Sequence, residues 1–366
     1  MAKQYGKIMT VWFGNRPTIV VSDYGSVWEV LVTKSSDFAS RSMTYRSKFM
    51  TAGWRTLSTL HFSDAWYNLR KGAQSSFFHP ANVLAQTPFQ ESDVQQMIRS
   101  IGEEATENDG VVNPLPHIRK GVVRLIGRLC FGPDFREDEY FVEAMDVIIE
   151  DTIKQMSVKS VADFFPFLRH IPGFNRPFLE AYKLKRRIED LISPFLDQYH
   201  SPSSSSSLFE MFILAVDSTS LTIAWALVFL IHDQQIQDKL YKELIGLEYY
   251  GKEGALGLEQ SRCRHNCYGE PLCMLHDPAV WKEADHFDPE RFLQDAAGRP
   301  QGKLRDREEE DAAICMTAME RSFFPFGAGR RICAGMELAK PHVALGLGNL
   351  VKAFQWSSAC EGKLTS

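Results

Sequence analysis

One stretch near the C-terminal end, residues 323–339, constrains the fold of this 366-residue chain more than any other, and it reads FFPFGAGRRICAGMELA. Pro325 disfavours regular strand pairing at the start of the stretch. Gly327 and Gly329 permit backbone turns that a residue with a Cβ atom resists. Cys333 then stands just before a segment of helical pattern. We therefore expect a glycine-rich loop that presents one cysteine and continues into a helix.

The neighbours of this cysteine indicate its chemistry. A thiol near a helix N-terminus, beside Arg330 and Arg331, has its thiolate form favoured by the helix dipole and by the positive charges. Apolar Phe326 and Ile332 complete its surroundings. A thiolate held in such a loop is a good soft ligand for a metal ion. The alternative is a buried, unreactive cysteine in an ordinary turn.

The pattern Phe326-x-x-Gly329-x-Arg331-x-Cys333-x-Gly335 resembles, position for position, the haem-binding loop of the cytochrome P450 monooxygenases of the eukaryotic microsomal type. In that family the cysteine is an axial ligand of haem b iron, and its thiolate favours O–O cleavage. The resemblance implies that Cys333 is the metal ligand and that the other four residues take part in cofactor binding. It also implies a mainly α fold, a helical bundle around haem with a small β-region near the N-terminus.

Composition and charge fit a globular protein. The chain is 44% hydrophobic and 24% charged, and its formal net charge of −5 gives no overall basic drive toward nucleic acid. The seven cysteines are an odd number without disulfide-like spacing, which favours a reducing compartment. Residues 1–14 contain no apolar run long enough for a signal peptide or membrane anchor. Against the resemblance, the chain therefore looks short at its N-terminus.

Trp66 and Arg70 form a second motif. A spacing of four residues places both side chains on one face of a helix. An indole N–H and a guanidinium group there can hold a carboxylate. The resemblance implies that this pair binds haem propionate together with Arg331. The alternative is a partly exposed aromatic residue beside a solvated arginine.

The longest apolar stretch, Leu208–Ile231, has the length of a membrane span, but Glu210 and Asp217 interrupt it. Because a charge inside a lipid-facing helix is costly, we expect a buried helix of a soluble domain. Its centre resembles the oxygen-activating helix of the family, with Asp217 as the acid and Ser218 where threonine is usual. The resemblance implies that both are catalytic, since the reaction needs an acid and a hydroxyl to deliver protons. The alternative is a core helix with one satisfied acid.

The remaining pattern is mostly helical. Ile8–Phe13 and Thr18–Val21 are rich in β-forming residues and predict a hairpin. The low-complexity run Ser201–Ser207 predicts a mobile loop. Apolar residues at three- and four-residue spacing predict helices around residues 94–107, 118–130, 140–157, 174–198 and 235–247, and from Met336 onward.

The resemblance is interrupted at residues 248–272, which we interpret as a deletion junction. The family places a Glu-x-x-Arg helix and most of a β-sheet there. Glu259-x-x-Arg262 is the single match to that pattern, and the apolar and proline residues that normally follow it are missing. Arg291, which belongs to a loop-supporting network in the family, is then expected to lack its partners. A zinc site is the alternative for this patch, although none of the common spacings of zinc ligands fits. The residues that are zinc ligands by type are Cys263, His265, Cys267, Cys273 and His276.

The resemblance covers most of residues 1–366, as a single incomplete domain with N-terminal, internal and C-terminal deletions. It implies insertion of one oxygen atom from O2 into an apolar organic substrate, with electrons from NADPH through a flavoprotein reductase. It places the protein at the cytosolic face of the endoplasmic reticulum membrane, with peripheral membrane contact, or in the cytosol because no anchor is seen. Nucleic acid is not expected as a partner. The alternatives are a truncated, catalytically inactive haem-thiolate protein and a haem-thiolate isomerase or dehydratase.

Overall fold

The fold is described from a computed structural model. The structure describes residues 2–250 and 325–359, together with residues 283 and 286–289, apart from short gaps at 15, 45, 48–50, 52, 54, 80, 82–86, 132–134, 136–138, 158–159 and 197–201. Contacts divide the chain into two compact units. Unit 1 contains Met1–Asp93, Arg119–Ser218 and Gly329–Gly335, and unit 2 contains Val94–Ile118, Thr219–Ala328 and Met336–Ser366.

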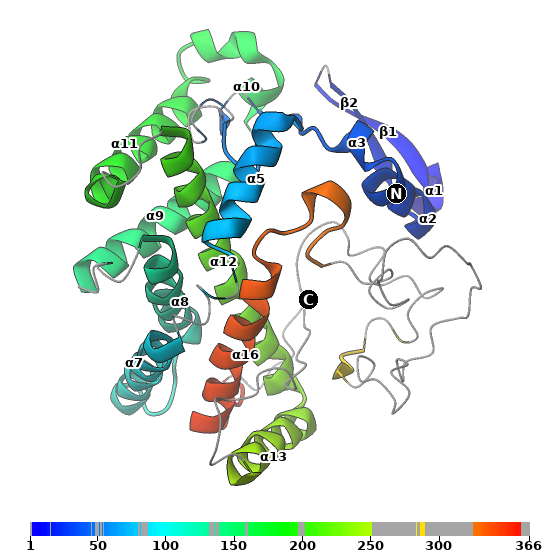
Figure 1. The fold of residues 1–366 in the computed structure, drawn as a ribbon. Helices are drawn as coiled ribbons and strands as arrows, with labels where there is room; N and C mark the ends of the chain where they lie inside the picture. The colour runs from blue at the N-terminus through cyan, green and yellow to red at the C-terminus, as the bar shows by residue number, and fades with distance from the viewer. Residues whose placement is uncertain are drawn as a thin grey trace. The chain divides into compact units, whose positions relative to one another are not determined.

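Helices account for most of the described chain, and one two-stranded sheet accompanies them, so the mainly α class with a small N-terminal β-region is confirmed (Figure 1). A π-helical turn spans Glu29–Thr33, and a 3-10 turn spans Pro166–His170. The helices are α1 (Ala2–Tyr5), α2 (Tyr24–Trp28), α3 (Ser35–Phe38), α5 (Asp64–Ser76), α7 (Thr87–Glu107), α8 (Pro114–Phe131), α9 (Glu139–Ser157), α10 (Val161–Phe164), α11 (Arg176–Leu196), α12 (Pro202–His232), α13 (Gln234–Tyr250) and α16 (Met336–Ala353).

The predicted hairpin is present near the N-terminus (Figure 1). Strand β1 (Ile8–Phe13) pairs antiparallel with β2 (Arg16–Val21), so that Ile8 lies opposite Val21. Gly14 turns the chain with a φ of +63°, and a Cβ atom there would lie 2.9 Å from the Cβ of Phe164. The ring of Phe13 stacks on Phe164, with 6.0 Å between their centroids. These contacts fix the hairpin against α10 within unit 1.

Helix α12 is a core helix, as its interrupted apolar pattern predicts. Its stretch Leu208–His232 is long and apolar enough to cross a membrane by length and composition, with a mean hydropathy of 1.9. In unit 1, however, Phe212 is fully buried and its ring lies 5.3 Å from that of Phe131. In unit 2, Leu227 is buried as well. Of the two acids of this helix, Glu210 is therefore buried in the core and Asp217 is half-buried.

The prediction of a loop at Ser201–Ser207 is wrong, because α12 already begins at Pro202. Proline suits the first turn of a helix, where its missing N–H would have no intrahelical partner. From Leu208 onward the apolar side chains pack into the core and stabilise the helix. Because serine has an ordinary helix propensity, the helix can extend towards the N-terminus through the serine run. A run of serines does not by itself prevent a helix.

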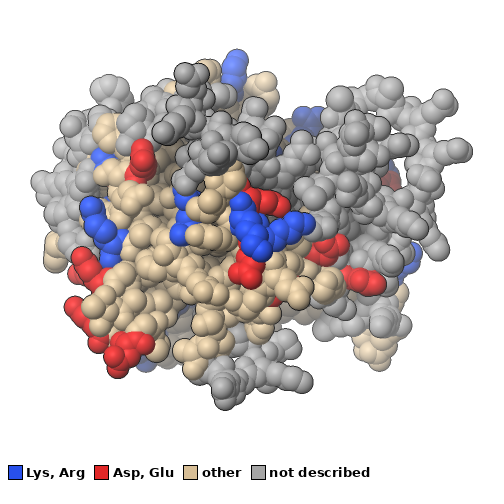
Figure 2. Space-filling model, turned by 90° about the horizontal axis from the view of Figure 1, so that it is seen from below, with Lys and Arg blue, Asp and Glu red and all other residues tan. Residues whose placement is uncertain are grey.

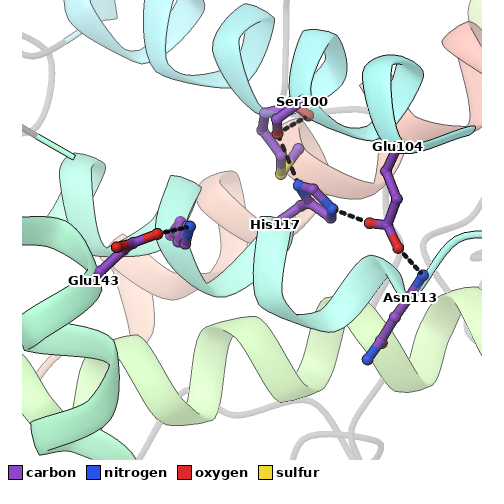
Figure 3. Close-up of polar contacts among 7 residues, drawn as sticks. Ser100, Glu104, Asn113, His117 and Glu143 are labelled. Carbon is purple, nitrogen blue, oxygen red and sulfur yellow. Dashed lines mark hydrogen bonds and ion pairs between the residues drawn. The ribbon is translucent and has the colours of Figure 1, made fainter. Parts of the chain in front are cut away.

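Within unit 2, His117 joins the end of α7 to the start of α8 (Figure 3). Its Nδ1 lies 2.9 Å from Ser100 Oγ, and its Nε2 contacts the carboxylate of Glu104. The backbone N–H of Asn113 donates to the same carboxylate at 3.3 Å. The hydrogen bonds from His117 and Asn113 lower the pKa of Glu104, so its ionised form is the one that holds this joint.

Charged side chains of both signs lie on the surface. On the face drawn in Figure 2, lysine and arginine side chains lie among aspartate and glutamate side chains, with wide uncharged areas between them. Neither sign dominates that face. This mixture accords with the small net charge of −5.

The buried histidine of α16 gives unit 2 a pH-dependent stability. The side chain of His342 is buried and its Nδ1 lies 2.6 Å from the Leu338 carbonyl oxygen. Burial lowers its pKa to about 4, against about 6.5 in an unfolded chain. Between these two pKa values the unfolded chain therefore binds a proton that the folded chain does not bind. The free energy of unfolding falls as the pH falls through this range. The expected loss from this residue is about 3 kcal/mol.

Urea unfolding of the wild type and of His342→Gln between pH 7.5 and 4 measures this contribution. The wild type should lose stability with acidification more steeply than the variant. His170→Gln, which changes an exposed histidine, is the matched control variant. Equal slopes for the wild type and His342→Gln would contradict the buried, neutral state of His342.

Candidate functional site

The loop that presents Cys333 is positioned by a left-handed glycine. A 3-10 turn spans Gly329–Arg331, and α16 begins at Met336. Gly329 has a φ of +66°, and a Cβ atom there would lie only 1.7 Å from the carbonyl oxygen of Leu31. Only glycine permits both the conformation and this approach. The loop therefore rests directly on the backbone of the Glu29–Thr33 turn in unit 1.

Cys333 is exposed, whereas Cys130, the other cysteine in the described part of the chain, is buried. Burial raises the pKa of the Cys130 thiol to about 12, which suits an unreactive core residue. The surrounding protein atoms also raise the pKa of Cys333, while the backbone N–H of Gly335 and the charge of Arg70 lower it. The Gly335 N–H and Arg70 thus act in the direction that the sequence predicts, and the pKa of Cys333 is nevertheless raised in the metal-free protein, because desolvation is the largest of these effects. Metal binding therefore has to displace the thiol proton.

Arg331 fastens the cysteine loop to unit 1 through main-chain oxygens. Its Nε donates to Ala39 O at 2.8 Å, and its two terminal nitrogens donate to Leu57 O at 3.1 Å and Leu60 O at 2.5 Å. Its guanidinium carbon lies 4.5 Å from the ring centroid of Trp66. Three hydrogen bonds and a cation–π contact hold this side chain in one orientation.

Helix α5 carries the predicted pair Trp66 and Arg70. Ser63 caps this helix, because its Oγ accepts the backbone N–H of Trp66 at 3.3 Å. The indole N–H of Trp66 donates to a main-chain oxygen, Leu57 O, at 3.0 Å. Arg70 donates to the carbonyl oxygen of Ile332 at 2.7 Å, next to the cysteine. The helical spacing thus brings both residues to the loop.

Three arginines, Arg41, Arg70 and Arg331, concentrate positive charge beside the cysteine loop. Desolvation, together with the charges of Arg41 and Arg70, lowers the pKa of Arg331 to about 10. Desolvation also lowers the pKa of Arg70, and the Cys333 side chain is its favourable electrostatic partner. Partly desolvated cations beside a thiol favour an anionic ligand. These residues therefore fit haem, which brings a metal ion for the thiolate and carboxylates for the arginines.

Asp217 and Ser218 lie on the part of α12 that belongs to unit 1. Desolvation raises the pKa of Asp217, and the charge of Arg119 opposes that shift. The hydroxyl of Ser218 donates to the Leu214 carbonyl oxygen at 2.7 Å. A serine that bonds its own helix in this way bends the helix locally and loosens the turn. The two side chains are therefore an acid of raised proton affinity and an oriented hydroxyl.

The structure brings some of the predicted residues together and leaves others aside. Cys333, Gly329, Gly335, Arg331, Trp66 and Arg70 all belong to unit 1, whereas Phe326 is half-buried in unit 2. Gly335 also lies close to an aromatic ring, since a Cβ atom there would be 3.3 Å from Phe78 Cε1. Arg291, the Glu259–Arg262 match, the zinc-ligand candidates and most of residues 248–272 lie outside the described residues. In the described part of the chain no group of three His, Cys, Asp or Glu residues is arranged for a metal ion.

Two residues near the site were not singled out as site residues. Arg41 donates to Ser58 O at 3.2 Å. Glu210 was seen only as an interruption of an apolar stretch. Its partners, Thr56 and Ser58, lie more than 150 residues away in the sequence, and no local pattern predicts them.

Comparisons with known proteins point to one family. A family model described as "Cytochrome P450" matches residues 1–207, 198–248 and 268–364 and leaves residues 249–267 unmatched. The chain is similar to the trifunctional (S)-stylopine/(S)-nandinine/(S)-canadine synthase of Argemone mexicana, at 37% identity over 99% of this chain and 80% of the relative. It is also similar to the (S)-canadine synthase of Coptis japonica, at 36% identity over 100% of this chain and 82% of the relative. That alignment has 419 positions, so the relative carries residues that this chain lacks.

A solved structure of a zebrafish cytochrome P450 with progesterone superposes on the chain with a TM-score of 0.72. The superposition covers 98% of this chain and 92% of the zebrafish chain, and the two are 20% identical in sequence. A second zebrafish cytochrome P450 structure, with abiraterone, gives a TM-score of 0.69 at 20% identity and covers 100% and 92% of the two chains. At such identities the likeness concerns the fold alone.

Proposed function

Since this chain belongs to the cytochrome P450 family, it is a haem-dependent monooxygenase, and we propose that Cys333 supplies the thiolate that ligates its haem iron. The observation that carries this proposal is the exposed thiol of Cys333 beside Arg70, in a loop that Gly329 and Arg331 fasten to the fold. The family has a redox partner that delivers electrons, and it uses O2 and an organic substrate.

When bound, haem supplies the activation of O2 for insertion of one oxygen atom into the substrate. The chain's own part begins with the thiol of Cys333, which gives up its proton when the metal binds. The backbone N–H of Gly335 and the charge of Arg70 then stabilise the negative sulfur. Phe326 is expected to pack near the thiolate and restrict its access to water.

Arg70 and Arg331 are proposed to hold the propionate carboxylates, together with Trp66. One of the five N–H donors of Arg70 is used by Ile332 O. The guanidinium carbon of Arg331 lies over the ring of Trp66, so its charge is fixed at the site while its N–H groups donate to Leu57 O and Leu60 O. A direct hydrogen bond from the Trp66 indole to a propionate stays a prediction, because that N–H donates to Leu57 O here.

Asp217 and Ser218 are proposed to deliver the protons that O2 reduction consumes. The raised pKa of Asp217 brings its proton affinity closer to neutral pH, where it can both accept a proton from solvent and release it. The Ser218 hydroxyl is oriented by its bond to Leu214 O, and its oxygen can also accept a hydrogen bond. A carboxyl group followed by a hydroxyl group forms a short proton relay.

The finer partner assignments follow from the family resemblance and from the surface. We propose that electrons come from NADPH through a flavoprotein reductase and that the substrate is an apolar small molecule. We also propose peripheral contact with the cytosolic face of the endoplasmic reticulum membrane. Exposed apolar side chains around the 3-10 turn Pro166–His170 support such contact, since Phe167 is 66% exposed and Ile171 and Phe174 are also exposed.

A catalytically inactive haem-thiolate protein is the second candidate. One observation favours it: the indole N–H of Trp66 and three N–H groups of Arg331 all donate to main-chain oxygens. Haem propionates would have to compete for these donors. The unmatched residues 249–267 point in the same direction, because the family's Glu-x-x-Arg helix is expected there.

Oxygen uptake driven by NADPH and a purified flavoprotein reductase tests the proposed function. Haem-loaded wild type should consume O2 and form an oxygenated product, and Asp217→Asn should lower the rate of product formation about 100-fold, because a general acid would be lost. Asp238→Asn, at an exposed position of α13, should match the wild type. Haem-loaded wild type without O2 uptake would establish the inactive alternative, and product formation without O2 would establish an isomerase or dehydratase.

A further inference from the structure

Glu210 is a buried acid of α12 that the proposed mechanism does not use. It lies seven residues before Asp217, two helical turns away on the same side of the helix. The side chain is 8% exposed. A buried carboxylate is costly unless hydrogen bonds compensate for its lost hydration. The hydrogen-bond donors to Glu210 therefore show which segment of the chain this residue stabilises.

All three donors to Glu210 come from one short segment, Thr56–Leu60, which we call the bridge segment. The hydroxyl of Thr56 donates to Oε1 at 2.8 Å, and the hydroxyl of Ser58 donates to the same oxygen. The backbone N–H of Ser58 donates to Oε2 at 3.1 Å. The Thr56 hydroxyl also lies 2.7 Å from that of Thr59, which keeps the segment compact. Glu210 thus fixes both the side chains and the backbone of the bridge segment.

Carbonyl groups of the bridge segment accept hydrogen bonds from Trp66 and Arg331. Leu57 O accepts from the indole N–H of Trp66 at 3.0 Å and from Arg331 at 3.1 Å. Leu60 O accepts from Arg331 at 2.5 Å. These are two of the three main-chain oxygens that orient Arg331, two residues before Cys333. The bridge segment therefore connects α12 to the cysteine loop within unit 1.

One peptide unit makes this connection directly. Leu57 O and the N–H of Ser58 belong to the same peptide group, and none of the described peptide bonds is cis. In a trans peptide the C=O and N–H point in opposite directions. The N–H end meets the carboxylate of Glu210 and the C=O end meets the guanidinium of Arg331. A peptide dipole whose two ends meet opposite charges is held in one orientation by two charge-assisted hydrogen bonds, each of which strengthens the other.

We propose that Glu210 is a positioning residue for the haem-ligating loop, acting through the Leu57–Ser58 peptide group on Arg331. The inference rests on the proposed role of Cys333 as the iron ligand. It assigns the loop a support from α12 that requires neither Arg291 nor a Glu-x-x-Arg helix. The helix that carries the proton-delivery pair also holds the cysteine loop in place.

The test compares Glu210→Ala with the wild type by two readouts. The first is the rate of haem loss to excess apomyoglobin, and the second is the share of the thiolate Soret band in the reduced CO spectrum. Glu210→Ala removes the acceptor of three donors, so haem loss should be about 10-fold faster or more, and part of the CO spectrum should shift to the band of haem without thiolate. Glu180→Gln is the control, because Glu180 is an exposed acid paired with Arg176 on α11, and it should leave both readouts unchanged.

A second variant keeps the test informative if Glu210→Ala does not fold. Thr56→Val with Ser58→Ala removes two hydroxyl donors but keeps the Ser58 N–H and the Leu57 carbonyl. It should change both readouts in the same direction by a smaller amount. Unchanged haem loss and an unchanged thiolate band in a folded Glu210→Ala or in the double variant would overturn the inference. A wild type without the thiolate band would overturn the role of Cys333 instead, so the two failures are distinguishable.

Discussion

Gly329→Ala is expected to displace the cysteine loop and to destabilise unit 1 by about 2–5 kcal/mol, of which about 1–2 kcal/mol comes from the left-handed backbone and about 1–3 kcal/mol from overpacking. Its φ is +66°, and the added methyl group would lie 1.7 Å from Leu31 O and 2.8 Å from the Leu31 carbonyl carbon. Both atoms belong to the backbone, so no side-chain rotation relieves the clash. The loop itself has to move, and Cys333 moves with it.

Thermal unfolding and haem content measure this effect, and the chain offers a matched control. Gly327 also has a positive φ, +74°, but a Cβ atom there would meet nothing within 4 Å. Gly327→Ala should therefore show the backbone cost alone and keep more of its haem. Similar losses in the two variants would mean that Gly329 does not lie against the Glu29–Thr33 turn.

Cys333→Ser is expected to abolish thiolate ligation while the fold is retained. A serine hydroxyl is harder than a thiolate and does not ionise near neutral pH, so it cannot replace the soft anionic ligand. Because Cys333 is exposed, the change leaves no cavity in the core. Haem per protein, measured after gel filtration, should fall strongly, while the far-ultraviolet circular dichroism spectrum remains that of the wild type.

Cys130→Ala is the control for this change, since Cys130 is buried and its pKa is raised to about 12. It should cost stability through lost packing but leave the spectrum of the bound haem unchanged. Full haem content with an unaltered spectrum in Cys333→Ser would show that another group ligates the iron.

Local patterns in the sequence predicted the elements of the fold well. The predicted hairpin starts at Ile8 and ends at Val21, as observed, and the helix predicted at residues 140–157 spans Glu139–Ser157. The spacing of Trp66 and Arg70 correctly placed both on one helix that reaches the cysteine loop. Such features depend on neighbours within one or two turns, which a sequence displays directly.

The partners of the charged groups could not be predicted in this way. Arg331 donates to Ala39 O, 292 residues away, and Glu210 accepts from Thr56, 154 residues away. Main-chain oxygens have no sequence signature, because every residue carries one. The desolvation that raises the pKa of Cys333 in the metal-free protein could not be predicted either, because it depends on the folded surroundings.

The central claim is that this chain binds haem through the thiolate of Cys333, and the absorbance spectrum of the reduced, CO-treated wild-type protein tests it most directly. The account predicts the long-wavelength Soret band of thiolate-ligated haem, and it predicts that this band is absent from Cys333→Ser. A band typical of imidazole-ligated haem, or a protein that takes up no haem, would contradict it.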